Sequence, residues 1–332
     1  MKHQRLIAAA TALALLAVPG LAAAQTFRLS SETNENSSRT QGGQKFADLL
    51  AEASGGEMKV KVFPNAVLTG GDQLKQAEML GRGALDFSVT SAITISNVVP
   101  EMAVFSLPYL FSGYDEVDAA VAGPAGARMA EIMEDHGLKL LAWGESGFRE
   151  LTNSTRPVTG PDDLKGLKIR VAGPMFIDVM TELGANPQQI QWTETFSALQ
   201  QGVVDGQENP IGAVIVPQRV YEVQDYITTW HYSYDPAFLM MSLQKWNGLS
   251  PEEQQMVQAA ATEAMDWQKA LTREQTAEGI ALLQAEGMEV YEPSADELAA
   301  FAAAAQPAFD KWADKVGDEL VTLFKPETVP GN

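Results

Sequence analysis

The chain has 332 residues but no cysteine and only three histidines. The absence of cysteine excludes disulfides, thiol catalysis and thiolate metal sites. Basic residues are scarce as well, since 23 Lys and Arg stand against 43 Asp and Glu, for a formal net charge of -20. A surface of this sign repels nucleic acid and anionic lipid, so no nucleic-acid partner is expected. An acidic protein that binds an anion must place a cation inside a cleft, and individual arginines therefore become informative.

Long apolar runs are absent after the first residues of the chain. Lys2 and Arg5 are followed by an apolar stretch and by the small residues Ala22–Ala24. This pattern is typical of an export signal over residues 1–24, too short for a stable membrane-spanning helix. We therefore expect a periplasmic protein whose mature chain begins near Gln25. The remaining length exceeds one comfortable core, so two domains are expected.

Strand-like and helix-like segments alternate through the first half of the mature chain. Such alternation predicts parallel strands connected by helical crossovers, which is an α/β fold. The expected strands cover residues 27–30, 58–63, 84–90, 138–143 and 168–171, and the expected helices cover 41–53, 72–82 and 123–136, with a short helical turn at 162–165.

One expected helix is unusually long. Ser250 is a good N-terminal cap, Pro251 occupies the first helical position, and Glu253 lies in the first turn. From there to about Ala285 only Gly279 interrupts the pattern, and a helix of this length would extend for roughly 50 Å. Since that exceeds one small domain, we expect the helix to bridge two. Two helices that break near Gly279 are the alternative.

Catalytic signatures occur only in incomplete form. Residues 144–148 resemble a nucleophile elbow but lack its final glycine, and no phosphate-binding loop of the Walker type is present. His136 lies at the charged end of an expected helix, where a solvated position is the simpler interpretation. His231, between two aromatic residues, remains a candidate for ligand contact. We expect no enzyme activity, no metal site and no cofactor.

Two arginines are candidates for binding an anion. Arg149 and Arg170 are each expected where a strand meets a loop, and the alternation in residues 168–171 directs Arg170 away from Ile169. A guanidinium group binds a carboxylate through two parallel hydrogen bonds. The alternative is an ion pair with one of the protein's own acidic residues.

A polar segment at residues 205–210 points to the same chemistry. It follows an expected helix at 193–201, and Trp192 comes just before that helix. Asn209 precedes Pro210, which favours an extended or turn conformation. We interpret the segment as a polar loop whose Asn209 amide is free to bind a ligand.

Four motifs together resemble a known family. They are Val104–Phe111, Gly147–Ser154, Asp163–Val171 and Asp205–Pro210, in this order along the chain. They are similar to the solute-binding subunits of tripartite ATP-independent periplasmic (TRAP) transporters, in the dicarboxylate-receptor (DctP) branch, and the resemblance covers nearly all of the mature chain.

The resemblance implies a two-lobed periplasmic-binding-protein fold, type II-like, with a ligand cleft between the lobes and a long helix at about 250–285 that bridges them. Lobe I is expected to comprise residues 25–146 and about 235–274, and lobe II residues 147–234 and about 275–325. The implied function is a monomeric receptor that delivers a small carboxylate to the small and large membrane subunits of a transporter.

The resemblance also implies roles for individual residues. Arg170 pairs with the ligand carboxylate, Arg149 supports it, Asn209 contacts the same carboxylate, and Trp192 stacks on the ligand.

The opposite end of the cleft is expected to determine which ligand binds. The residues predicted to contact the ligand at that end are Glu32, Ser91 and Thr90. Positions 32 and 91 differ from the residues that sialic-acid receptors commonly carry at the corresponding places. A sugar acid such as a uronate and a C4-dicarboxylate remain open as ligands, and so does a zwitterion of the ectoine type. A sensor partner with the same fold and a periplasmic hydrolase or lyase are the remaining hypotheses.

Overall fold

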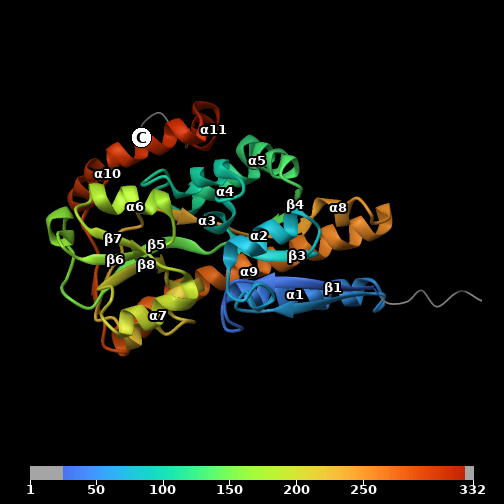
Figure 1. Ribbon diagram of the computed structural model, residues 1–332, viewed down its shortest axis with the longest axis horizontal. Coiled ribbons are helices and arrows are strands. Elements are labelled where there is room, and N and C mark those ends of the chain that lie inside the picture. The colour runs from blue at the N-terminus through green and yellow to red at the C-terminus, as the bar shows by residue number, and fades with distance from the viewer. Residues whose placement is uncertain (1–24, 326–332) are drawn as a thin grey trace, which may run out of the picture.

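The computed structural model describes residues 25–325, so the predicted export signal at 1–24 lies outside the described residues. Two β-sheets lie side by side, each flanked by helices (Figure 1). This arrangement confirms the predicted α/β class. The strands are not all parallel, however, because β11 runs antiparallel to both of its neighbours in the first sheet.

The first sheet has five strands in the order β2-β1-β3-β11-β4. They are β1 (Gln25–Ser31), β2 (Met58–Phe63), β3 (Phe87–Ser91), β4 (Leu138–Trp143) and β11 (Ala237–Ser242). The helical segments near it are α1 (Ser38–Ala53), η1 (Val67–Thr69), α2 (Gln73–Gly81), α3 (Ala92–Ile95), η2 (Pro100–Ser106), α4 (Tyr114–Ala122), α5 (Pro124–Asp135) and α8 (Leu243–Trp246).

The second sheet has the order β12-β9-β5-β8-β6-β7, with β10 paired to β5. Its strands are β5 (Gly147–Asn153), β6 (Lys168–Val171), β7 (Asn186–Gln189), β8 (Gly206–Pro210), β9 (Tyr226–Thr228), β10 (Tyr234–Asp235) and β12 (Glu289–Tyr291). The remaining helical segments are η3 (Pro161–Leu164), α6 (Pro174–Glu182), α7 (Trp192–Gln200), η4 (Ile211–Ile215), η5 (Val220–Glu222), α9 (Pro251–Ala285), α10 (Ala295–Val316) and α11 (Asp318–Phe324).

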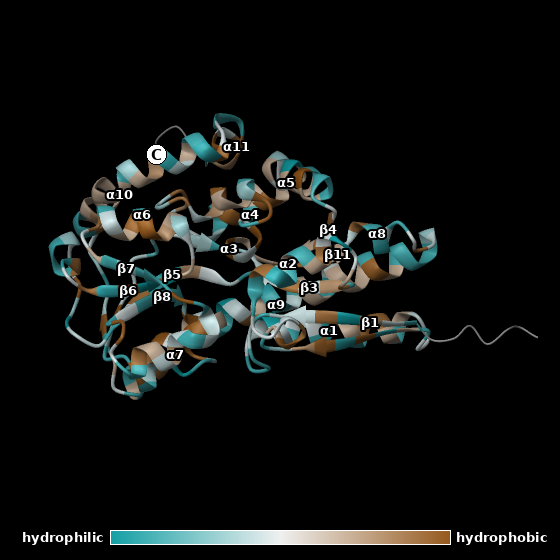
Figure 2. Cartoon of the chain, viewed as in Figure 1, coloured by the Kyte–Doolittle hydropathy of each residue, from teal (hydrophilic) through white to brown (hydrophobic). Residues whose placement is uncertain are grey.

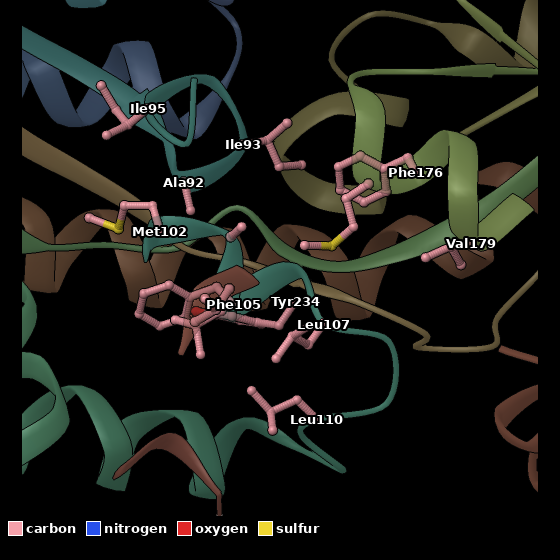
Figure 3. Packing of buried hydrophobic residues seen from close by; sticks show 14 of the residues in the cluster. Ala92, Ile93, Ile95, Met102, Phe105, Leu107, Leu110, Phe176, Val179 and Tyr234 are labelled. Carbon is pink, nitrogen blue, oxygen red and sulfur yellow. The ribbon is translucent and has the colours of Figure 1, made fainter. Parts of the chain in front are cut away.

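Alternating apolar side chains give the first sheet a core on each face. In β11, Leu239 and Met241 join the core beneath α1 and α9, whereas Phe238 and Met240 point to the opposite face. The core on that opposite face continues to the helices of the second sheet. Ile93 of α3 and Phe176 of α6 lie close together in Figure 3 and line the same small cavity. The two halves of the molecule are therefore in contact along their facing sides.

Helix α9 is one unbroken helix, as predicted, and the alternative of a break near Gly279 is wrong. The Ser250 hydroxyl accepts a hydrogen bond from the Glu253 amide, and the Glu253 carboxylate accepts one from the Ser250 amide. Val257 packs in the core of the first sheet, and Leu283 packs in a core of the second. The helix therefore contacts both halves of the molecule, running across them in Figure 1.

Buried polar groups fix α9 to the point where the chain passes from the first sheet to the second. The Gln268 side chain donates to the Glu145 carbonyl at 2.7 Å and accepts from the Glu145 amide at 2.9 Å. One turn farther on, Arg273 pairs with the Glu145 carboxylate at 2.7 Å and with Asp118 of α4 at 2.9 Å. Because Glu145 lies between β4 and β5, these contacts hold the crossing segment against the helix.

The prediction of a polar loop at 205–210 is wrong, because residues 206–210 form the buried strand β8. Figure 2 shows β7 and β8 as predominantly hydrophilic strands. Burial is possible because the polar side chains find partners in other segments: Glu208 binds Arg149, and Gln207 donates to Thr152 at 3.0 Å. Arg149, which was expected where a strand meets a loop, is the third residue of strand β5.

We expect Gly279→Ala to lower the melting temperature, although alanine normally stabilises a helix relative to glycine by about 1 kcal/mol. A Cβ atom at position 279 would lie 2.5 Å from Cγ2 of Ile211 in η4. Such overpacking costs about 1–3 kcal/mol, which exceeds the gain in helix propensity. Thermal unfolding of Glu278→Ala, at an exposed neighbouring position, is the control. A melting temperature for Gly279→Ala at or above wild type would contradict the close contact of α9 with η4.

Candidate functional site

A cavity lies between the two sheets, at the carboxyl ends of several strands. This is where ligands bind in open α/β sheets. Its free volume is about 630 Å³, including the part open to solvent. Side chains from both halves of the molecule line it: Glu32, Arg39, Gln73, Leu74, Ser91, Ile93, Thr94, Asn97, Arg149, Arg170, Ala172, Gln189, Gln191, Trp192, Asn209, Val214 and Asp235.

Arg170 is a buried cation that has no acidic partner among the described residues. It lies near the end of β6 with 3% of its surface exposed, and its Nε atom donates to the Ile190 carbonyl at 2.9 Å. Within residues 25–325 it forms no ion pair; the nearby ion pairs belong to Arg149. Burial and the charge of Arg149 lower the pKa of Arg170 to about 10, and Glu208 only partly opposes them. The guanidinium of Arg170 is therefore available to an anion in the cavity.

Arg149 differs from Arg170 because its charge is already balanced. Its guanidinium binds the Glu208 carboxylate through Nε and through Nη2, the latter at 2.9 Å, and the Tyr232 hydroxyl donates to the same carboxylate at 2.6 Å. Burial alone would lower the pKa of Arg149, but pairing with Glu208 raises it above its ordinary value. The alternative of an internal ion pair thus applies to Arg149.

Asn209 and Trp192 lie on the cavity wall with Arg170. Asn209 is buried in β8, and its side-chain amide donates one hydrogen bond to the Gln207 side chain, so that one of its two N–H groups can still donate to a ligand. The ring of Trp192, at the start of α7, lies 5.4 Å from the Arg170 guanidinium carbon. That contact is a cation–π interaction, and it keeps the guanidinium beside an aromatic face.

Glu32 lies on the wall contributed by the first sheet. Its carboxylate pairs with Arg39 of α1 at 3.2 Å and accepts a hydrogen bond from Thr90. Burial raises the pKa of Glu32, while Arg39 and Thr90 act in the opposite direction. Ser91 also lines the cavity. Thr90 is not among the lining residues and instead donates its hydrogen bond to Glu32.

His231 lies away from the cavity walls. Its side chain is 51% exposed, and its Nδ1 atom is 3.3 Å from the buried Glu150 carboxylate. Burial raises the pKa of Glu150, and the nearby His231 lowers it. The structure therefore places His231 beside Glu150 rather than with Arg170 and Trp192.

Two charged lining residues were missed in the sequence, Arg39 and Asp235. Arg39 precedes the helix expected at 41–53, so no signal marked it; in the structure it lies in the first turn of α1, where a cation opposes the helix dipole and is stabilised by an acidic partner. That partner is Glu32. Asp235 carried no signal either, since acidic residues are abundant in this chain.

The arrangement defines a protein that binds a small anion between two α/β lobes. Among the residues that the structure describes, no cluster of His, Asp or Glu side chains is placed to hold a metal ion. Over the same residues, 25–325, none of the helices has both the length and the apolar character needed to cross a membrane.

Comparison with known proteins identifies the family. The chain belongs to the DctP family, bacterial extracellular solute-binding protein family 7, whose model matches residues 29–315. Among its relatives are the 2,3-diketo-L-gulonate-binding periplasmic protein YiaO of Escherichia coli, 35% identical over 81% of each chain, and the C4-dicarboxylate-binding periplasmic protein DctP of Rhodobacter capsulatus, 31% identical over 96% of each.

A solved TRAP periplasmic solute-binding protein from Ralstonia eutropha, with bound (S)-2-acetolactate, matches the fold with a TM-score of 0.88. It is 35% identical, and the match covers 90% of this chain and 97% of that one. The resemblance to TRAP receptors and the fold that it implied are therefore confirmed. Because the family consists of solute-binding proteins, the expectation that this chain is not an enzyme is confirmed as well.

Proposed function

We propose that the protein is the periplasmic receptor of a TRAP transporter for a small hydroxylated carboxylate, with sugar acids as the leading class. The observation that carries the proposal is the buried guanidinium of Arg170, which lines the cavity and has no acidic partner within residues 25–325. The names of the relatives support this class, since one binds 2,3-diketo-L-gulonate and another was solved with 2-acetolactate. A C4-dicarboxylate is the second candidate, by analogy with the Rhodobacter capsulatus relative.

In this proposal Arg170 forms paired hydrogen bonds with the ligand carboxylate. Asn209 contacts the same carboxylate, and Trp192 covers an apolar face of the ligand. Arg149 acts indirectly, because Glu208 already holds it, and it adds positive potential beside Arg170. Ligand contact by His231 would require a rearrangement of its exposed side chain.

Glu32, supported by Thr90, and Ser91 would form polar contacts with the far end of the ligand. An ectoine-type zwitterion is less well matched to this end, because Arg39 already balances the charge of Glu32. A ligand cation would have to displace that buried pair or lie beside a second cation, and either is unfavourable. Hydroxyl groups can bind here without changing the charge of the site.

The lobes are proposed to divide where the chain passes between the sheets. These passages are the segment from β4 to β5, the segment from β10 to β11, and helix α9. The positions of these passages support a lobe I of residues 25–146 and about 235–274, and a lobe II of residues 147–234 and about 275–325. Ligand that binds the closed state more tightly than the open state shifts the population toward closure. The closed monomer would then be recognised by the small and large membrane subunits, after export directed by residues 1–24.

The proposal is tested by thermal unfolding of the mature protein, refolded from denaturant to remove any ligand, against uronates, aldonates, C4-dicarboxylates and ectoine. A ligand present at 100 times its dissociation constant adds about 2.7 kcal/mol to the stability. We expect a clear rise in melting temperature with sugar acids, followed by calorimetric titration of the best binder. If the uronates, aldonates and C4-dicarboxylates all leave the melting temperature unchanged while ectoine raises it, the assignment to a hydroxylated acid is wrong and the ligand is a zwitterion.

A further inference from the structure

The segment that leads into helix α1 is hydrogen-bonded to the segment around η4, which belongs to the other half of the molecule. The Asn34 side chain donates from Nδ2 to the Pro217 carbonyl at 3.1 Å, and the Ser37 hydroxyl donates to the Ala213 carbonyl at 2.8 Å. Ser37 is buried, whereas Asn34 and Pro217 are half-buried. The bond from Asn34 therefore lies on the solvent side of this junction.

The backbone of its own turn holds the Asn34 side chain in this orientation. Its Oδ1 atom accepts hydrogen bonds from the Asn36 amide at 3.0 Å and from the Ser37 amide at 3.2 Å. Because two backbone donors occupy Oδ1, the Nδ2 group is the one directed at the Pro217 carbonyl. Asparagine commonly fixes a turn in this way, and here the same side chain also reaches the other half of the molecule.

The two halves approach each other at further points along the cavity. Next to Ser37, the Ser38 hydroxyl shares a hydrogen bond with Thr272 of α9 at 2.7 Å. At another place Gly71, which precedes α2, lies against Thr193 of α7, since a Cβ atom at position 71 would be 3.2 Å from Cγ2 of Thr193. The bond from Asn34 to Pro217 thus belongs to an arrangement in which the two halves are drawn together.

Both partners of this bond are close in the chain to residues that line the cavity. Glu32, which lines it from the first sheet, precedes Asn34 by two residues. Asn209 lines it from β8, and the chain continues from there through η4 to Pro217. A ligand that contacts Glu32 and Asn209 together would therefore bring the segments of Asn34 and Pro217 together as well.

We propose that Asn34 is a latch, whose hydrogen bond to the Pro217 carbonyl keeps the lobes closed over the ligand and slows its release. Neither residue lines the cavity, so the latch acts on closure and not through contact with the ligand. Because the bond can form only while the lobes are together, it shifts the population toward the closed state and raises the apparent affinity. This inference rests on the proposed function, since it assumes a ligand that binds between the lobes.

Asn34→Asp tests the latch with little change in shape. Aspartate keeps an oxygen acceptor for the Asn36 and Ser37 amides, and a negative charge is favourable near the start of a helix. It removes the donor, however, and places a carboxylate against the Pro217 carbonyl. A hydrogen bond contributes roughly a factor of two to ten to an equilibrium. We expect the dissociation rate of the ligand to rise about tenfold, while the association rate stays within about twofold of wild type.

Dissociation of D-glucuronate, or of a screened acid that binds more tightly, is measured by stopped-flow fluorescence of Trp192 on the cavity wall. Dividing the dissociation rate by the calorimetric dissociation constant gives the association rate.

Asn36→Asp is the matched control, because it adds the same charge two residues away. The Asn36 side chain is exposed and forms no hydrogen bond among the described residues. Its variant should release the ligand at the wild-type rate. Asn34→Ser adds no charge and shortens the donor, so it should speed release by about fivefold. It also replaces Asn34→Asp if that variant does not fold.

Faster release from the Asn34 variants, with Asn36→Asp unchanged, supports the latch. Release from Asn34→Asp at the same rate as from Asn36→Asp overturns it and leaves the carboxylate receptor intact. A loss of affinity that comes only from slower association also overturns it, because a latch acts after the ligand has entered. If no acid binds the wild-type protein, the proposed function fails and this inference fails with it.

Discussion

Arg170→Ala is expected to abolish measurable binding of the carboxylate ligand, with a loss of affinity of about a hundredfold to a thousandfold. The guanidinium is buried, lines the cavity and forms no ion pair within residues 25–325, whereas the other two lining arginines, Arg39 and Arg149, are paired with acidic side chains. Arg170→Lys should also bind weakly, because a point charge does not reproduce the planar pair of donors. Calorimetric titration with the best ligand from the screen measures the loss.

The same side chain is expected to destabilise the protein when no ligand is bound. Burial lowers the pKa of Arg170 from its ordinary value to about 10. For a cation, a folded pKa below the unfolded one means that the charged form is disfavoured on folding at every pH below about 10. The shift corresponds to a cost of about 3 kcal/mol at neutral pH.

Arg170→Met should therefore raise the melting temperature of the ligand-free protein while it removes binding. Arg82→Met is the control for the change in net charge, since the Arg82 side chain is 80% exposed. It should alter neither property. Near-normal affinity in Arg170→Met would refute the carboxylate assignment, and a lower melting temperature would show that the arginine stabilises the fold instead.

Local sequence signals were sufficient for much of the fold. The strands at 58–63, 138–143 and 168–171 have the predicted bounds, and the Ser250 cap marks the start of the long helix. In each case the evidence is a periodic pattern of apolar residues or a helix-capping residue, and it lies within a few neighbouring residues.

The site was predictable only in part, because its decisive partners are distant in sequence. Arg170 was expected on the cavity wall, and it lies there. The internal partner of Arg149, however, is Glu208, which is 59 positions away. Without that contact the segment 205–210 looks too polar for a buried strand. The pairing of Glu32 with Arg39 and the position of Asp235 likewise depend on how the two lobes come together.

Glu208→Gln is expected to destabilise the protein by about 3–5 kcal/mol, the cost of leaving a buried charge without its partner. Glu208 is fully buried and accepts hydrogen bonds from Arg149 and Tyr232. Glutamine has a similar shape but no charge, and the next carboxylate, Asp235, lies 3.8 Å from Arg149. Urea unfolding monitored by circular dichroism measures the change.

Glu222→Gln is the matched control, because Glu222 forms an ion pair with Arg219 in which both side chains are exposed. Exposed pairs contribute about 1 kcal/mol or less, so this variant should unfold close to wild type. Replacement of both buried partners, in Arg149→Met with Glu208→Leu, should recover much of the stability lost in Glu208→Gln, since no uncompensated charge then remains. A Glu208→Gln variant as stable as the Glu222→Gln control would mean that Arg149 does not depend on Glu208. Arg149 would then be free to bind the ligand carboxylate directly beside Arg170.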